Sequence, residues 1–136
     1  MRVHASAVAL EGQGVLITGA AGSGKSSLAL TLMAFGAVLI ADDQTELWRE
    51  GDTLWARAPD SINGLIEART VGILKAKSAP APIVLAIDMD RMETKRLPER
   101  HHVTHLGVTL PCLHKSDSPA WPAAIMQYLK GGRRDP

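Results

Sequence analysis

The sequence contains one cysteine, Cys112, in 136 residues, so an internal disulfide is excluded. Nothing argues for an oxidising compartment, and we expect Cys112 to be a buried, inert thiol. Long apolar runs are also absent, since none approaches the roughly 20 residues that span a bilayer. The net charge of +1 gives no steering toward nucleic acid or acidic membranes. The first residues lack the apolar stretch of a secretory signal, and we therefore expect a cytoplasmic protein with no nucleic-acid or membrane partner.

The length and composition are those of one globular domain. Hydrophobic residues make up 46% of the chain and charged residues 21%, which is normal for a folded protein with one core. We expect a single domain over residues 1–129. Residues 130–136 are rich in glycine and charge, and we expect them to form a disordered tail.

A complete phosphate-binding loop occupies residues 19–26, which match the pattern G-x-x-x-x-G-K-[ST]. Glycines allow the backbone to turn its N–H groups toward an anion, and the N-terminus of a following helix adds partial positive charge. In this pattern the lysine reaches the outer phosphates and the serine hydroxyl ligates Mg²⁺. The sequence thus predicts binding of a nucleoside triphosphate, ATP, with Mg²⁺. The predicted nucleotide-binding residues are Gly19, Ala20, Ala21, Gly22, Ser23, Gly24, Lys25, Ser26 and Ser27.

The segments around the loop have the order that the motif requires. Residues 15–18 favour a buried strand, and residues 26–35 carry apolar side chains at helical spacing, ended by Gly36. Further strands are predicted at 3–10, 37–41, 83–87 and 108–110, with a hairpin at 46–58 and a helix at 122–129. Few strands are followed by a helix. The predicted fold class is therefore α/β, a compact P-loop kinase domain with a mixed β-sheet containing antiparallel pieces.

Acidic residues follow one of these strands. Asp42 and Asp43 come directly after the strand at 37–41, where a ligand of an α/β sheet is expected. Neighbouring residues of an extended segment point in opposite directions, so one aspartate would face the site while the other braces the loop. An aspartate here could act as the general base of phosphoryl transfer, although a pair of solvated turn residues is also compatible with the sequence.

Glu67 and Arg69 form a second candidate pair. They stand at i and i+2 in the strand-like segment 65–74, and so share a face if the segment is a strand. The carboxylate could ligate Mg²⁺ and the arginine could meet phosphate oxygens. A surface ion pair is equally compatible with this spacing.

The second half of the chain is rich in histidine, at positions 101, 102, 105 and 114. The spacing suggests a metal site, but no cysteine or carboxylate in the sequence completes a recognisable tetrahedral pattern. We therefore expect solvated loop histidines.

Four segments together resemble the catalytic domain of the HPr kinase/phosphorylase family. They are His4 with the glycines that lead to the phosphate loop, the loop itself, residues 39–43 (L-I-A-D-D), and residues 66–73 (I-E-A-R-T-V-G-I), which are similar to the family signature I-E-I-R-G-L-G-I. They cover about the first half of the chain.

The resemblance implies roles for individual residues. Asp43 matches the catalytic aspartate, Asp42 its companion and His4 the active-site histidine, while Lys25 belongs to the phosphate loop. Ser26 and Glu67 match the Mg²⁺ ligands, and Arg96 is a weaker match to an arginine near the transferred phosphate. It further implies ATP-dependent phosphorylation of a serine of the phosphocarrier protein HPr. The reverse reaction uses inorganic phosphate and yields pyrophosphate, and the family assembly is a hexamer.

The chain also departs from the family pattern. We expect it to lack the family's separate N-terminal domain and to have one C-terminal helix in place of two. Residues 111–117 (P-C-L-H-K-S-D) stand where the family has a P-V-x-x-G-R-N-like segment linked to dephosphorylation, and Thr70 replaces a signature glycine. Short forms of this kind resemble those of alphaproteobacteria. Kinase activity is therefore the firmer expectation. Two other readings stay open: a small-molecule P-loop kinase, and a non-catalytic nucleotide-sensing module.

Overall fold

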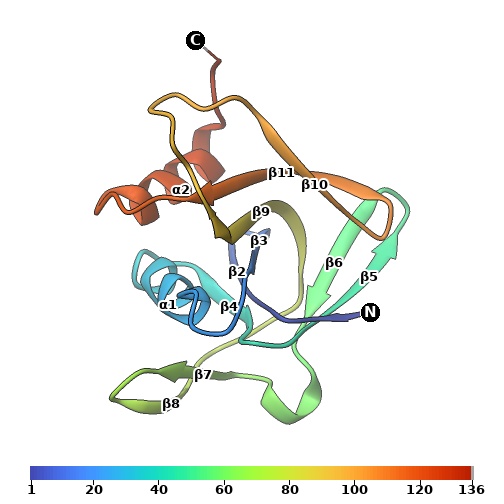
Figure 1. Cartoon of the computed structure of the whole chain (residues 1–136). Helices are drawn as coiled ribbons and strands as arrows, with labels where there is room; N and C mark the ends of the chain where they lie inside the picture. Colours follow the sequence, from blue (N-terminus) through green and yellow to red (C-terminus); the bar gives the residue numbers. More distant parts are fainter. Residues whose placement is uncertain (136) are drawn as a thin grey trace.

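The computed structural model describes residues 1–135 (Figure 1). It has two α-helices, α1 (Lys25–Ala34) and α2 (Trp121–Gly131), and one short 3₁₀ helix, η1 (Asp60–Ile62). The strands are β1 (Arg2–Val3), β2 (Ala5–Leu10), β3 (Gln13–Thr18), β4 (Val38–Ala41), β5 (Thr45–Glu50), β6 (Thr53–Arg57), β7 (Leu65–Ala68), β8 (Gly72–Lys75), β9 (Ala81–Met92), β10 (His101–His105) and β11 (Val108–Lys115). None of the helices in the described part of the chain has the length and apolar character needed to cross a membrane.

Nine of the strands form one mixed, curled sheet (Figure 1). The order β1-β5-β6-β9-β3-β2-β4 gives the main path, and the β10–β11 hairpin joins it through β9. The long strand β9 lies parallel to both β3 and β11. The first residues of β9 also pair with β6, which runs antiparallel to them. The strands β7 and β8 form a separate antiparallel hairpin. The predicted α/β class with a mixed sheet is therefore confirmed.

The sheet is apolar on both faces because core side chains alternate along its central strands. Val15 and Ile17 of β3 pack into a cluster under α1 and α2. Leu16, between them, packs into a second cluster with small residues of β2 and with Leu47 and Leu54 of the β5–β6 hairpin. Burial on both faces explains why these strands read as continuous apolar runs in the sequence.

A tight turn fixes the register between β2 and β3, the strand that leads into the phosphate loop. The β2–β3 hairpin turns at Glu11 (φ 51°) and Gly12 (φ 78°), both in the left-handed region. Such a two-residue turn has the twist that antiparallel neighbours need. The resulting register sets Ala5 opposite Thr18, so the chain before β2 lies beside the residue that enters the phosphate loop.

The structure corrects several predicted boundaries. The strand predicted to end before Asp88 continues to Met92, because pairing with β11 extends it beyond its apolar run. Residues 101–105 form β10 and not a loop. The segment 65–74 is a hairpin and not one strand, so Arg69 lies in the turn after β7 and does not share a strand face with Glu67. The helix α2 continues through Gly131, beyond the domain boundary predicted at residue 129.

The predicted disordered tail makes contacts where the structure describes it. Arg133 donates to the carbonyl oxygen of Pro98, and the Asp135 carboxylate pairs with the Arg100 guanidinium at 2.9 Å. These contacts attach residues 133–135 to the connection between β9 and β10. Residue 136, also part of the predicted tail, lies outside the described residues.

Candidate functional site: the phosphate-loop cleft

The phosphate loop connects β3 to α1, as the motif predicts. Gly22 (φ 81°) and Gly24 (φ 98°) adopt left-handed backbone conformations, and Gly24 is the N-cap of α1. The helix begins at Lys25, so the first N–H groups of α1 have no carbonyl partner within the helix and carry partial positive charge. This end of α1 is built to receive an anion.

The Lys25 side chain is buried at the loop and held by the loop itself. Its Nζ atom donates hydrogen bonds to the carbonyl oxygens of Gly19 (2.9 Å) and Ala20 (3.1 Å). A flexible ammonium group can exchange such carbonyl partners for phosphate oxygens. The Lys25 ammonium group therefore already lies at the loop, where the outer phosphates of a nucleotide are expected.

The carboxylate of Asp42 connects three segments. Its Oδ1 atom accepts hydrogen bonds from the hydroxyls of Ser26 (2.6 Å) and Ser6 (2.9 Å). Its Oδ2 atom accepts the backbone N–H of Glu67 at 3.0 Å. Asp42 is buried and thereby fixes the loop serine, strand β2 and strand β7 relative to one another.

The neighbouring Asp43 is exposed and has a different partner. Its Oδ1 atom lies 2.7 Å from Nε2 of His4, the residue between β1 and β2. The backbone of Asp43 is left-handed (φ 67°), a conformation that is uncommon for residues other than glycine and that occurs at functional sites. The structure thus separates the two aspartates as the sequence predicts, with Asp42 bracing the loop and Asp43 facing outward beside His4.

An open cleft of ≈ 280 Å³ lies in front of the loop. Asp43, Glu67 and Arg69 line it from one side. The lining residues from the loop side are Ala21, Gly22, Gly24, Lys25, Ser26 and Ser27. The cleft therefore collects the predicted loop, the predicted base and the Glu67–Arg69 pair, although Arg69 reaches it from a turn.

The structure does not bring Arg96 to this cleft. Arg96 lies in the connection between β9 and β10 and lines a different pocket, beside α2. Its match to the resemblance rested on one short segment, and that segment lines the pocket together with Trp121 and Tyr128 of α2. Within the described chain, Arg96 is not part of the phosphate-loop site.

Three other residues complete the loop and were not predicted. Asp90, near the end of β9, accepts the backbone N–H of Ala20 at 3.0 Å. Lys115 donates to the carbonyl oxygen of Ser23 at 3.2 Å. The buried Ser6 donates to Asp42 and accepts the backbone N–H of Asp43 at 3.1 Å. Only Ser6 left a sequence signal, as a hydroxyl inside an apolar strand.

The donor set of the cleft fits Mg²⁺. The hydroxyl of Ser26 and the carboxylate of Glu67 supply hard oxygen atoms to the cleft, which this ion prefers. Ser26 and Asp42 are already joined by the 2.6 Å hydrogen bond, and Glu67 lines the same cleft. Ser26 and Glu67 would hold the ion, with Asp42 positioning the serine.

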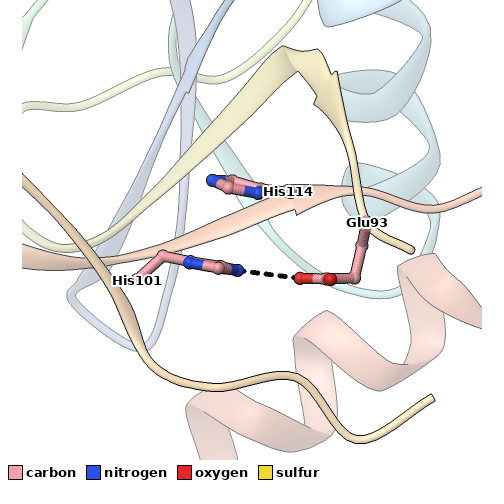
Figure 2. Close-up of side chains that lie close together, drawn as sticks. All are labelled: Glu93, His101 and His114. Atoms are coloured by element: carbon pink, nitrogen blue, oxygen red, sulfur yellow. Dashed lines mark hydrogen bonds and ion pairs between the residues drawn. The ribbon is translucent and has the colours of Figure 1, made fainter. Parts of the chain in front are cut away.

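A second cluster of titratable groups lies away from this cleft. Oε1 of Glu93, at the end of β9, lies 2.9 Å from Nε2 of His101, and the His101 ring stacks on that of His114 with centroids 3.8 Å apart (Figure 2). The hydrogen bond from His101, with backbone N–H donors from residues 94 and 95, holds the pKa of Glu93 below its ordinary value. The expectation of solvated loop histidines is therefore wrong for His101 and His114, because both lie on strands and pack against each other. Glu93 is a neighbouring carboxylate that the sequence pattern did not reveal.

Comparison with known proteins agrees with this architecture. Residues 1–105 match the family model of the HPr Serine kinase C-terminal domain. The HPr kinase/phosphorylase of Halalkalibacterium halodurans is 39% identical over 107 residues, which are 72% of this chain and 34% of that protein. The enzyme of the same name from Streptococcus equi subsp. zooepidemicus is 31% identical over 123 residues, 80% of this chain and 40% of that protein. The chain thus spans little more than a third of the curated relatives' length.

A solved structure extends the match to nearly the whole chain. The Hpr(Ser) kinase/phosphatase from Coxiella burnetii superposes with a TM-score of 0.79 at 26% sequence identity, covering 96% of this chain and 94% of that one. The family model, the relatives and the superposition agree on the family and the fold. The chain belongs to the HPr serine kinase C-terminal domain family.

Proposed function

We propose that this chain is a cytoplasmic, ATP-dependent protein serine kinase whose acceptor is HPr, the phosphocarrier protein of a bacterial phosphotransferase system. The observation that carries the proposal is that one open cleft contains Lys25, Ser26, Asp43 and Glu67. A phosphate-loop lysine binds the donor, and an exposed carboxylate in the same cleft can serve an acceptor hydroxyl. Membership of the family supports HPr as the protein that carries this hydroxyl.

The reaction is an in-line transfer of the γ-phosphoryl group. The acceptor serine loses its hydroxyl proton to Asp43, a new bond forms between the serine oxygen and the γ-phosphorus, and the bond from that phosphorus to the β–γ bridging oxygen breaks to release ADP. His4 engages Oδ1 of Asp43 and leaves Oδ2 for the proton. His4 is therefore a positioning residue for the base.

The loop side of the cleft binds the triphosphate. Lys25 exchanges its loop carbonyl partners for β- and γ-phosphate oxygens, and the N-terminus of α1 adds N–H donors. Bound Mg²⁺ supplies neutralisation of charge on the phosphate oxygens. Arg69, which lines the same cleft, is placed to meet the acceptor or the transferred group.

The decisive experiment is transfer of radiolabel from ATP to purified HPr by the wild-type chain and by Asp43→Asn. The amide cannot accept the proton, so transfer should fall at least about 100-fold. The shift in Tm caused by ATP with Mg²⁺ should persist, because the loop is unchanged. Asp52→Asn is the matched control, since Asp52 is an exposed aspartate at the tip of the β5–β6 hairpin.

Other outcomes separate the alternatives. Full transfer by Asp43→Asn contradicts the assigned base. Wild-type binding of ATP with no transfer to HPr would favour a small-molecule kinase or a nucleotide-sensing module, and no Tm shift with ATP and Mg²⁺ would contradict all three. Incubating serine-phosphorylated HPr with inorganic phosphate and measuring pyrophosphate tests the reverse reaction. Light scattering tests the hexamer that family resemblance implies.

A further inference from the structure

We propose that Glu93, His101 and His114 form a binding site for a transition-metal ion of the Zn²⁺ class, separate from the phosphate-loop cleft. Each residue offers one ligand atom, and these atoms all lie within 4.8 Å of one another. Two imidazoles and one carboxylate are a donor set that binds Zn²⁺ with an open position for water or a further ligand. The proposal is independent of the proposed kinase activity.

His101 and His114 stand on the paired strands β10 and β11, and Glu93 is the residue directly after β9, which fixes their relative positions (Figure 2). In the β10–β11 hairpin, His101 is paired with Cys112, so His114 is its diagonal neighbour on the same face. The backbone N–H of Glu93 donates to the carbonyl oxygen of Lys115 at 2.8 Å, which holds the end of β9 beside His114. A site on paired strands is more precisely positioned than one on free loops.

The carboxylate is oriented before any ion arrives. Oε2 of Glu93 accepts the backbone N–H groups of Thr94 (3.0 Å) and Lys95 (3.2 Å), which leaves Oε1 directed at His101. Such outer contacts orient a ligand and strengthen metal binding.

The imidazoles also have nitrogen atoms available. Within residues 1–135 the His114 ring stacks on His101, and no hydrogen bond to its nitrogens is found. The proton shared by His101 and Glu93 lies where an ion would bridge the same two atoms. Two parallel, stacked rings direct the lone pairs of their nitrogen atoms side by side and not toward one point. Binding of one ion by both histidines therefore requires the rings to turn apart. Rotation of the side chains supplies this change while the strands stay in place.

The surrounding charges leave room for a cation. Four basic residues line the same pocket: Lys95, Arg96, Arg133 and Arg134. Two of them have acidic partners, since Lys95 lies 3.0 Å from Glu99 and Arg133 lies 3.4 Å from Asp135, which also pairs with Arg100. Side-chain exposure is only 22% for His101 and 17% for Glu93, so water competes weakly for the ligand atoms. A bound ion would connect β9 to the β10–β11 hairpin.

The test is titration of the metal-free chain with Zn²⁺ by calorimetry, with Co²⁺ as a spectroscopic substitute. We expect one Zn²⁺ per chain, a higher Tm with Zn²⁺, and Co²⁺ absorption bands typical of nitrogen ligation. His114→Gln, His101→Gln and Glu93→Gln should each weaken Zn²⁺ binding at least about 10-fold. His102→Gln is the matched control, since His102 is the exposed neighbour on β10 and is not in the cluster.

Several results would overturn the site. The first is the absence of a one-to-one Zn²⁺ complex, and the second is an equal loss of binding in His102→Gln and His114→Gln. The third is unchanged binding in the three cluster variants. That result would mean that the ion binds to other ligands, such as the oxygen atoms of the cleft. Circular dichroism checks that each variant folds. If His101→Gln does not fold, His114→Gln and the Co²⁺ spectrum of the wild-type chain still decide the outcome.

Discussion

Two regions of this molecule are organised around one carboxylate each. In the phosphate-loop cleft, Asp42 accepts two hydroxyls and one backbone N–H from three segments that lie 16 to 36 residues away. At the end of β9, Glu93 accepts two backbone N–H groups from the next two residues and one imidazole from His101, eight residues on. The first carboxylate joins distant parts of the fold, and the second orders its own neighbourhood.

The difference shows how binding chemistry depends on the partners of a carboxylate. Around Asp42 the donors are hydroxyls and amides beside an anion-binding helix terminus, which suits a hard ion and phosphate. Around Glu93 the side-chain partner is the imidazole of His101, on which that of His114 stacks, and imidazoles suit a transition metal. The two regions meet at the parallel pair β3–β9, so both are held by the same central strands.

The largest expected effect tests the connecting role of Asp42. In Asp42→Asn the amide nitrogen cannot accept hydrogen bonds, so buried donors lose partners, and the free energy of unfolding should fall by about 3 kcal/mol. Urea denaturation measures this change. The control is Asp43→Asn, the exposed neighbour, which should lose less than about 1 kcal/mol. Equal losses in the two variants would show that Asp42 does not join the segments.

The next prediction tests the contact between the two regions. At Gly14 of β3, an added Cβ would lie 2.5 Å from the carbonyl oxygen of Pro82 and 2.8 Å from Cδ1 of Ile83, both on β9. Gly14→Ala should therefore cost about 2 kcal/mol by overpacking. Denaturant unfolding gives the value. Gly131→Ala, where the nearest atom lies at 3.4 Å, should change stability by less than about 1 kcal/mol. A neutral Gly14→Ala would mean that β3 and β9 can separate.

The phosphate-loop region was predictable from the sequence to a large extent. Its loop has a motif whose chemistry is local, and Asp42 and Asp43 follow a strand at the edge where ligands bind. That the two aspartates point in different directions was predicted from their adjacency, and their roles in catalysis stay a prediction. The left-handed backbone of Asp43 and the hydroxyl of Ser6 beneath it were not predictable, because they depend on how β2 and β4 meet.

The second region was not predictable, for a physical reason. His101 and His114 belong to two strands and Glu93 directly follows a third, and their meeting depends on the parallel β9–β11 pair and its irregularity after His114. Neither apolar periodicity nor spacing encodes a long-range parallel pair. The strand β10 alternates half-buried and exposed side chains without an apolar run, so it resembled a loop. Arg96, in the connection that follows β9, lines the pocket beside α2 and not the phosphate-loop cleft.

A smaller effect is expected beside the cleft, where the β7–β8 hairpin carries Glu67. Thr70, in its turn, has φ 70°, which is strained for a β-branched residue. Thr70→Gly should relieve that strain. Glycine also adds conformational entropy to the unfolded chain, which opposes the gain, so the free energy of unfolding should rise by about 0.5–1 kcal/mol. Thermal unfolding measures the gain. Thr53→Gly, at the start of β6, should instead destabilise, and a loss in both variants would contradict the strain.

The smallest predicted effect concerns Glu46, a partly exposed carboxylate with two arginine partners, in contrast to the buried Asp42. Glu46 accepts hydrogen bonds from Arg57 (3.0 Å) and Arg2 (3.1 Å), which hold its pKa below the ordinary value. A lowered pKa contributes stability above the ordinary carboxylate pKa of about 4.3, and this contribution disappears as the pH falls through the lower pKa of the folded state. Wild type should therefore be slightly more stable than Glu46→Gln near neutral pH, and the difference should vanish in acid, below the lowered pKa of Glu46. Unfolding curves at both pH values, repeated at high salt, check this. A difference that persists in acid would mean that Glu46 stabilises the fold through contacts that do not depend on its charge.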